Sequence, residues 1–308
     1  MTTQIRLGYC CISLGKFESK FKTMTLTRAK ALKRESEKAF NEKLTKLWAH
    51  NLEELEKILT YNLEANIRLY RLSSDLFPLA DHEEFEEFWT TFKQVKANFN
   101  GARKAVAKYV EAGGRLCAHP GQFVSIGSPN KKVRTNSLKN LELHADIFAR
   151  LDLPRGLEAP LNIHLSNGKD NIKNLSFFNE SIHNMSPNLI SRLVFENEDK
   201  SFWTWQKIRN YFYNFPITLD FHHRNINNEG ETEKLAFEAC AATWGETIPL
   251  MHISEGKKAA LDRSHHDWVT TLPKALLDKK ISVDLEIEAK KKDLATLFLK
   301  NKYKDIVI

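Results

Sequence analysis

Residues 216–223 place one carboxylate and two imidazoles directly after a short strand-like run. Asp220, His222 and His223 follow residues 217–219, and the stretch contains no cysteine. Carboxylate oxygens and neutral imidazole nitrogens are donors for a divalent metal, and the lack of sulfur argues against a structural zinc site. Adjacent histidines in a polar loop are more often solvated side chains than ligands, so this stretch alone is weak evidence.

Other histidines and acids occupy the same kind of position, at or just beyond the end of a strand-like segment. Taken singly, each has an ordinary explanation as a core histidine, a loop residue or the ion-pair partner of a lysine. Their shared placement is what makes them candidates for a common site. They are His82, His119, His164, Glu196, Asp220 with His222 and His223, His252, His265 and Glu288.

Strand-like segments alternate with helical patterns along the chain. The strands are predicted at residues 5–11, 67–72, 115–119, 161–165, 193–196, 216–221, 248–253 and 281–288. Helices are predicted at 35–63, 83–111 with a break near 100–101, 135–151, 176–185, 202–212, 233–243 and 267–277, whereas 14–27 is expected to be a basic loop.

Eight strands that alternate with helices predict parallel pairing through right-handed crossovers, and eight such units close into a (β/α)8 TIM barrel. We expect one α/β domain over residues 1–308, with 292–308 forming a basic C-terminal helix or tail. Because the C-terminal ends of barrel strands gather at one face, the candidate residues are expected to converge in one pocket there.

Such a pocket can hold more than one divalent ion, and paired ions suit phosphodiester cleavage. Mixed nitrogen and oxygen donors favour manganese, zinc or iron over calcium. The net charge of +7 favours a polyanionic partner, with nucleic acid ahead of a membrane surface. The four cysteines form no CxxC pair, and no signal-like or membrane-spanning segment is present, so we expect a reduced, cytoplasmic setting.

Several motifs together resemble the UV damage endonuclease family, over residues 5–290. The most specific is His119-Pro-Gly-Gln-Phe123, and the ordered set of acids and histidines accompanies it. The others are Leu7-Gly-Tyr-Cys-Cys11, Arg71-Leu-Ser-Ser-Asp-Leu-Phe-Pro78 leading to His82, Asn162-Ile-His164, Phe195-Glu-Asn197, Leu219-Asp-Phe-His-His223, Met251-His252, His265-His-Asp-Trp268 and Glu288-Ala-Lys290.

The resemblance implies a barrel related to endonuclease IV and xylose isomerase. It implies an enzyme that nicks duplex DNA immediately 5′ to cyclobutane pyrimidine dimers and 6-4 photoproducts with a divalent metal cluster, manganese first, with Zn²⁺, Mg²⁺ or Fe²⁺ as alternatives. His223 is preferred to His222 because the family spacing is Asp-x-x-His. Carried over by motif, the metal ligands are His82, His119, His164, Glu196, Asp220, His223, His252, His265 and Glu288, and the catalytic set is Glu196, Asp220, His252 and Glu288.

Three residues match positions that contact the lesion in the family. Gln122 and Phe123 correspond to a pair that wedges into the duplex, where they offset an unstacking cost of roughly a few kcal/mol. The alternative for Phe123 is a core aromatic after a tight turn. Tyr9 is expected to line the pocket near the flipped bases. The implied partner is UV-damaged double-stranded DNA, with no membrane and no obligate protein partner, bound by a monomer in the cytoplasm or nucleoid.

The chain departs from the family pattern at Leu250, where a lysine is often found two residues before the histidine that matches His252. Some members also have tyrosine at the position of Phe123, and some relatives have a polar amide at that of Ser13. A leucine cannot bind a metal, so metal number or rate is expected to differ. An abasic-site endonuclease, a sugar isomerase of the same fold and a damage-binding protein with weakened catalysis therefore stay open as alternatives.

Overall fold

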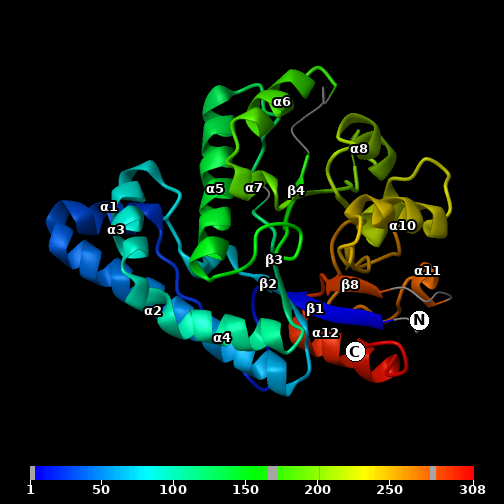
Figure 1. Ribbon diagram of the computed structural model, residues 1–308, viewed down its shortest axis with the longest axis horizontal. Helices are drawn as coiled ribbons and strands as arrows, with labels where there is room; N and C mark the ends of the chain where they lie inside the picture. The colour runs from blue at the N-terminus through cyan, green and yellow to red at the C-terminus, as the bar shows by residue number, and fades with distance from the viewer. Residues whose placement is uncertain (1–3, 122, 166–171, 201, 278–281) are drawn as a thin grey trace.

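The sheet of this protein is an almost closed barrel of parallel strands (Figure 1). The computed structural model describes residues 4–121, 123–165, 172–200, 202–277 and 282–308. The strand order is β6-β5-β4-β3-β2-β1-β8-β7, and every pair of neighbours is parallel. The strands are β1 (Gln4–Cys10), β2 (Leu69–Leu72), β3 (Arg115–Ala118), β4 (Leu161–His164), β5 (Leu193–Glu196), β6 (Ile217–Thr218), β7 (Leu250–Ile253) and β8 (Ser282–Ile287).

The two strands at the ends of this order meet and close the barrel. Asp220 and His252 are parallel bridge partners, and the backbone N–H of His252 donates to the carbonyl oxygen of Leu219 at 3.0 Å. The predicted TIM-barrel fold is therefore confirmed. Near the N-terminus, Ile5 and Val307 also form a parallel bridge, so the two ends of the chain lie side by side (Figure 1).

Helices surround the sheet, and three of them extend away from it at the left of Figure 1. These three are α1 (Leu26–Glu35), α2 (Glu37–Glu64) and α3 (Glu86–Gln94). The others are α4 (Asn100–Glu111), α5 (Lys131–Arg150), α6 (Leu175–His183), α7 (Pro187–Ile190), α8 (Trp205–Tyr211), α9 (Phe221–Ile226), α10 (Glu233–Ala241), α11 (Lys274–Leu277) and α12 (Lys292–Lys302), with 3₁₀ turns at Ser74–Leu76, Glu83–Phe85, Lys96–Phe99 and Ala242–Trp244.

The long helix α2 shows why the outer layer forms. The Ser36 hydroxyl caps it by accepting from the Ala39 N–H, and one apolar stripe along the helix is buried. Within that stripe the Trp48 ring packs edge-on against Phe77 and Phe92. Each large apolar side chain removed from water in this way contributes roughly 1.5–3 kcal/mol to folding.

Four local predictions need correction. The loop predicted at 14–27 ends at Thr25, which caps the unpredicted helix α1 at 26–35 by accepting from the Arg28 N–H. The predicted helix at 83–111 breaks at Val95, whose ψ of 92° is extended, and not at 100–101. Only Lys274–Leu277 of the predicted helix 267–277 is helical, since Pro273 lacks the N–H that a longer helix needs. The sixth strand ends at Thr218, and residues from Phe221 onward are helical.

Alternation along the strands decides which polar side chains enter the barrel. At its N-terminal end, Arg6 and Arg115 both pair with the buried Asp284, and the Arg115 Nη1 to Asp284 Oδ2 distance is 2.6 Å. Two residues further along β8 from Asp284, Glu286 faces the same interior, and Glu288 follows just after the strand. The barrel is thus filled at both ends by charged groups, of which only those at the C-terminal end reach the predicted site.

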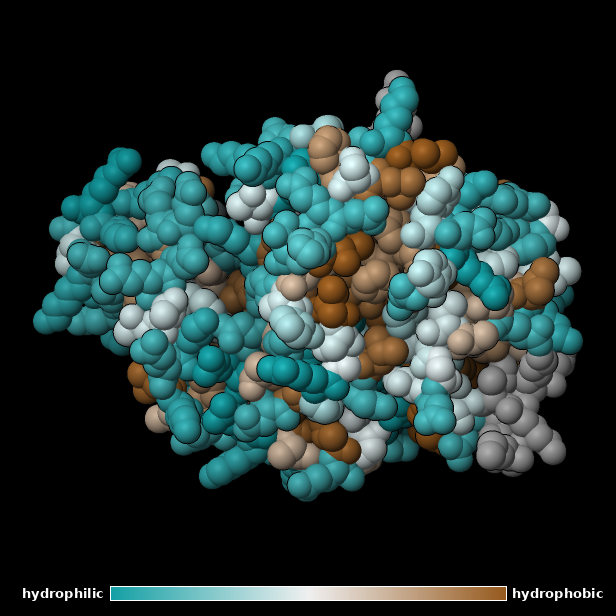
Figure 2. Space-filling view, turned by 45° about the horizontal axis from the view of Figure 1, so that its top comes forward, coloured by the Kyte–Doolittle hydropathy of each residue, from teal (hydrophilic) through white to brown (hydrophobic). Residues whose placement is uncertain are grey.

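Hydrophilic side chains cover most of the face seen in Figure 2, and hydrophobic residues gather near its middle. In the described ranges, no helix combines the length and the apolar character needed to cross a bilayer.

Candidate metal centre

Glu196 is the centre of a histidine cluster inside the barrel mouth. Its carboxylate is fully buried at the last residue of β5. Oε2 lies 3.1 Å from His119 Nε2 and 3.1 Å from His252 Nδ1. Oε1 lies 3.3 Å from His223 Nδ1 and 3.9 Å from His164 Nε2. Residues more than a hundred positions apart in sequence therefore surround a single carboxylate.

The strands bring these side chains together through their register. His164 ends β4 and pairs with Glu196 of β5, while Asp220 and His252 pair across the closing seam. His119 follows β3 directly, and its Nδ1 lies 3.1 Å from the carbonyl oxygen of Pro120. A hydrogen bond from Nδ1–H to that carbonyl oxygen fixes the ring and leaves the lone pair of Nε2 to bind a metal, as is usual for metal-binding histidines.

Asp220 is held by the backbone so that one of its oxygens points to the cluster. As the N-cap of α9, its Oδ1 accepts from the His223 N–H at 2.7 Å. The side chain of Asn197 forms two hydrogen bonds with the backbone of Asp220. It accepts from the Asp220 N–H at 2.8 Å and donates to the Asp220 carbonyl oxygen at 3.1 Å. The other oxygen, Oδ2, is buried without a hydrogen-bond partner in the described structure.

Glu288 and His265 form the outer part of the cluster. Glu288 Oε1 lies 3.8 Å from His252 Nδ1, and Oε2 lies 3.7 Å from His265 Nδ1. The His265 side chain is 31% exposed, whereas His252 is completely buried. The cluster therefore runs from the barrel interior to the solvent, as a site that must reach a large substrate requires.

The donors present fit divalent metal ions. Three groups of donor atoms each lie within 4.8 Å of one another: His119, Glu196 and His252; Glu196, Asp220 and His223; and Asp220, His252 and Glu288. Glu196 Oε1, Asp220 Oδ2 and both ring nitrogens of His252 are buried without hydrogen-bond partners among the described residues. Buried polar atoms in proteins are normally paired, so these unpaired donor atoms fit a bound cation, and their nitrogen and oxygen chemistry suits manganese, zinc or iron.

In the metal-free protein, protonated histidines balance the negative charge of the cluster carboxylates. Burial lowers the pKa of His252, but the negative carboxylates of Glu196, Glu286 and Glu288 together outweigh burial and raise the pKa to about 10. The same two opposing effects raise the pKa of His164 to about 9. Burial raises the pKa of Glu196, yet His252 and His164 hold that pKa well below its usual value. The site is thus built to hold positive charge next to Glu196.

Three of the predicted site residues are not brought into this cluster. His82 caps a 3₁₀ turn, where its Nδ1 accepts from the Glu84 N–H at 3.2 Å. His222 points away, with Nε2 2.8 Å from the carbonyl oxygen of Asp262. Tyr9 is fully buried on the outer side of β1, where its hydroxyl donates to Asn62 at 2.8 Å, because strand alternation turns its neighbours and not Tyr9 into the barrel.

Phe123 is exposed near the cluster, four residues after His119. Its side chain is 88% exposed, which excludes the alternative that it is a core aromatic. The N–H of Val124, the residue after Phe123, donates to the carbonyl oxygen of Gly121 at 3.0 Å. Gln122 lies outside the described residues.

Four polar residues that support the cluster were not among the predicted site residues, although three of them lie in the quoted motifs. Arg71 Nη1 lies 2.7 Å from Glu286 Oε1 and 2.7 Å from Glu288 Oε1. Asn162 donates to Glu196, and Asn197 holds Asp220 as described. Glu286 was detectable, since it lies two residues before Glu288 and must share its side of β8. On β7, Leu250 is fully buried two residues before His252 and offers no ligand atom.

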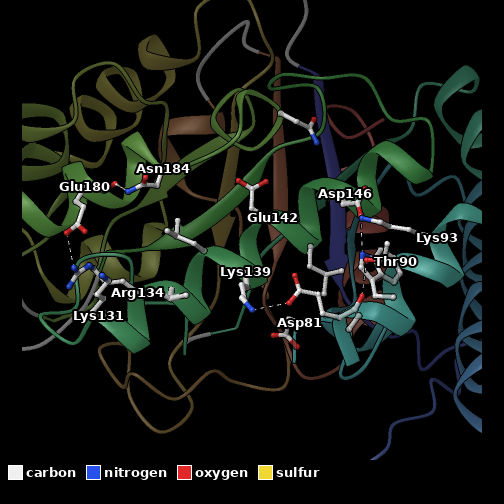
Figure 3. A pocket seen from close by; sticks show the side chains of 17 residues that line it. Asp81, Thr90, Lys93, Lys131, Arg134, Lys139, Glu142, Asp146, Glu180 and Asn184 are labelled. Carbon is white, nitrogen blue, oxygen red and sulfur yellow. Dashed lines mark hydrogen bonds and ion pairs between the residues drawn. The ribbon is translucent and has the colours of Figure 1, made fainter. Parts of the chain in front are cut away.

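A second cavity, of about 670 Å³, lies between α3, α5 and α6 (Figure 3). No residue of the metal cluster lines it. Its charged groups pair with one another, as Lys93 does with Asp146 and Arg134 with Glu180, both at 2.8 Å. We therefore place the functional site at the barrel mouth and not in this cavity.

Comparisons with known proteins match this chain over nearly its whole length. The family model described as UV-endonuclease UvdE matches residues 5–307. A protein from Nostoc sp. named UV DNA damage endonuclease is 32% identical over 317 residues, covering 97% of this chain and 90% of that protein. One of the same name from Bacillus mycoides is 30% identical over 310 residues, covering 96% and 93%.

Solved structures agree with the fold. The crystal structure of SacUVDE has a TM-score of 0.79 at 24% identity and covers 98% of this chain and 99% of its own. Endonuclease IV from Thermus thermophilus has a TM-score of 0.54 at 12% identity, with 82% and 94% covered, which is a likeness of fold alone. From the match over nearly the whole chain and the two relatives at 30% identity or above, the chain belongs to the UV-endonuclease UvdE family.

Proposed function

We propose that this protein is a metal-dependent endonuclease that nicks duplex DNA immediately 5′ to UV photoproducts, cyclobutane pyrimidine dimers and 6-4 photoproducts. The observation that carries the proposal is the orphaned donor set around Glu196, which lies at the same barrel face as the exposed Phe123. Relatives named UV DNA damage endonuclease support the reaction class.

The cluster residues have distinct roles in this proposal. Glu196, Asp220, His252 and Glu288 would hold the ions, because the first three each belong to two of the three donor groups and Glu288 completes the group of Asp220 and His252. His119, His164, His223 and His265 would complete the coordination from the surrounding strands and loops. Bound divalent ions supply a hydroxide at neutral pH and stabilise the charge on the cleaved phosphate. Asn162 and Asn197 orient the carboxylates by hydrogen bonds to Glu196 and to the backbone of Asp220.

DNA recognition would use the rim of the same face. Phe123, with Gln122, would fill the space left when damaged bases leave the stack, a step that costs less for a lesion that already pairs poorly. The Phe123 side chain is 88% exposed, so its ring is accessible to a DNA partner at this face.

A basic loop lies next to the cluster and would contact the phosphate backbone. The loop after β7 folds back on itself: Gly256 and His265 are antiparallel bridge partners, and the Lys257 N–H donates to the carbonyl oxygen of Ser264 at 2.7 Å. This pairing places Lys257 and Lys258, both exposed, beside the cluster residue His265. Exposed lysines near a phosphodiester site favour binding of the DNA backbone through release of counterions.

The decisive experiment uses the purified protein with Mn²⁺ and a labelled duplex that carries a single cyclobutane dimer. Undamaged and abasic duplexes, and a chelator, serve as controls. We expect a chelator-sensitive nick directly 5′ to the dimer and an intact undamaged duplex. Cleavage of the abasic duplex alone would assign an abasic-site endonuclease. Tight binding of the dimer without cleavage would assign a damage-binding protein, and no effect on any DNA would contradict the proposal.

A further inference from the structure

A fourth group of donor atoms lies beneath the metal cluster and differs from the other three. Cys10, Glu286 and Glu288 offer ligand atoms within 4.8 Å of one another. This group contains a thiol and no histidine, and it shares only Glu288 with the groups described above. Its donors would suit a thiophilic divalent ion such as zinc or cobalt.

This fourth group already contains a cation, because Arg71 projects into it. Nη1 of Arg71 lies 2.7 Å from Glu286 Oε1 and 2.7 Å from Glu288 Oε1, and the Arg71 side chain is only 14% exposed. The register explains the position: Arg71 of β2 pairs with Cys10 of β1 on one side and with Cys117 of β3 on the other. All three side chains therefore enter the barrel at one level.

The carboxylate of Glu286 is saturated by these neighbours. The thiol of Cys10 lies 3.3 Å from Oε1, which also forms an ion pair with Arg71, and the thiol of Cys117 lies 3.3 Å from Oε2. Glu288 is in a different state. Its Oε1 contacts Arg71, while its Oε2 faces His265 in the outer part of the cluster. Arg71 thus contacts both Glu286, whose two oxygens already have partners, and Glu288, whose Oε2 remains available to a metal.

We propose that Arg71 is a positioning residue that takes the place of a metal ion in the group Cys10, Glu286 and Glu288. A guanidinium is always charged and has a fixed planar set of donors, so it neutralises the two carboxylates permanently and orients Glu288 toward the cluster. Arg71 also keeps a divalent ion out of the thiol-containing group, because a second cation there would be repelled. The metal content of the protein would accordingly be set by this residue as well as by the ligands.

The test replaces the cation and counts the bound metal. Arg71→Met removes the charge and keeps an unbranched side chain, and Arg71→Lys retains a charge. Bound Zn²⁺ or Co²⁺ per chain is measured by mass spectrometry of the metal, and a Co²⁺–thiolate bond is detected by its near-ultraviolet absorption. We expect Arg71→Met to bind one more ion per chain than the wild type and to gain the thiolate band, and Arg71→Lys to keep the wild-type stoichiometry.

Two further variants separate this role from a general loss of structure. Adding Cys10→Ser to Arg71→Met should abolish the thiolate band. Arg6→Met, which removes an arginine from the pair with Asp284 at the other end of the barrel, should leave the metal content unchanged. A folded Arg71→Met protein with wild-type metal content and no thiolate band would overturn the proposal, as would a variant that binds fewer ions than the wild type.

The wild-type protein gives an independent outcome if Arg71→Met does not fold. A Co²⁺ titration of the wild type should show no thiolate band, and its appearance would contradict the exclusion of metal by Arg71. The inference rests on the metal cluster of the proposed function, but its readout is metal binding and not DNA cleavage. A protein that binds the ions as expected yet fails to nick dimers would contradict only the proposed function, whereas a thiolate band in a protein that nicks dimers would contradict only the role of Arg71.

Discussion

Asp220 and His252 face each other across the seam at which the barrel closes. They are bridge partners, and the His252 N–H donates to the carbonyl oxygen of Leu219 at 3.0 Å. With Glu288 they also form one of the metal donor groups. The same two residues therefore close the barrel and contribute to the site. Substitutions at the seam must be designed to separate their effect on stability from their effect on metal binding.

Asp220→Asn should separate these two roles. The amide oxygen can still cap α9 at the His223 N–H, where Asp220 Oδ1 now accepts at 2.7 Å, but the amide has lost the anionic oxygen for the metal. We expect nicking to fall by more than about 100-fold while the free energy of unfolding, measured in urea with chelator, changes by less than about 1 kcal/mol. Asp220→Ala should lose the cap as well and cost about 1 kcal/mol more.

The two adjacent histidines should behave differently. His223 faces Glu196 at 3.3 Å, whereas His222 contacts the carbonyl oxygen of Asp262 at 2.8 Å. We therefore expect His223→Gln to lose bound metal and His222→Gln to retain it, as measured by metal analysis after dialysis. Loss of metal in both variants, or only in His222→Gln, would contradict this assignment.

Phe123→Ala should weaken discrimination between damaged and undamaged duplex without changing the metal content. A base–aromatic contact of this kind contributes roughly 1–3 kcal/mol, so the preference for the dimer should fall by about tenfold or more. The matched control is Tyr213→Ala, because Tyr213 is also an exposed aromatic, at 76%. Equal effects of the two substitutions in competition binding would show that Phe123 has no special role.

Lys257 and Lys258 should contribute to the salt dependence of DNA binding. Each phosphate contact that is lost lowers the slope of log K against log salt by about 0.9, so the double alanine variant should lower it by up to about 2. Lys104→Ala with Lys108→Ala is the control, since these exposed lysines lie on α4, and Lys108 is in its last turn, away from the barrel mouth. An unchanged slope in the Lys257 and Lys258 variant would place the backbone contacts elsewhere.

The metal-free protein should lose stability as the pH rises. Burial opposes the protonation of His164, but Glu196 and Glu198 together outweigh burial and raise the pKa of His164 to about 9, and the pKa of His252 is raised to about 10. A raised pKa in the folded state gives stability that is full below the unfolded value of about 6.5 and is lost as the pH rises through the folded value.

Urea unfolding with chelator at pH 6.5 and pH 10 measures this effect, and we expect a loss on the order of a few kcal/mol. Saturating Mn²⁺ should remove most of the loss, because the metal replaces the protons beside Glu196. In Glu196→Gln the dependence on pH should shrink, since the charge that raises both pKa values is gone. A metal-free wild type that is equally stable at both pH values would contradict the proton-compensated site.

The sequence by itself determined the architecture and predicted most of the side chains that gather around Glu196. Eight parallel strands that alternate with helices can close into a barrel, and that closure gathers the strand ends at one face. His119, His164, Glu196 and His252 could therefore be assigned to a common site from their position after apolar segments. Glu286 could have been added by the period of two along β8, which places it on the same side as Glu288.

The tertiary structure alone decided which way several side chains point. After Asp220 the chain turns into α9, so the period changes from two to about 3.6 and His223, not His222, returns to Glu196. Tyr9 alternates outward to Asn62, and Phe123 stands in solvent, although both are aromatic residues in motifs. The pairing of Arg71 with Glu286 and Glu288 depends on three strands in register, a relationship between residues up to 217 positions apart that local sequence does not encode.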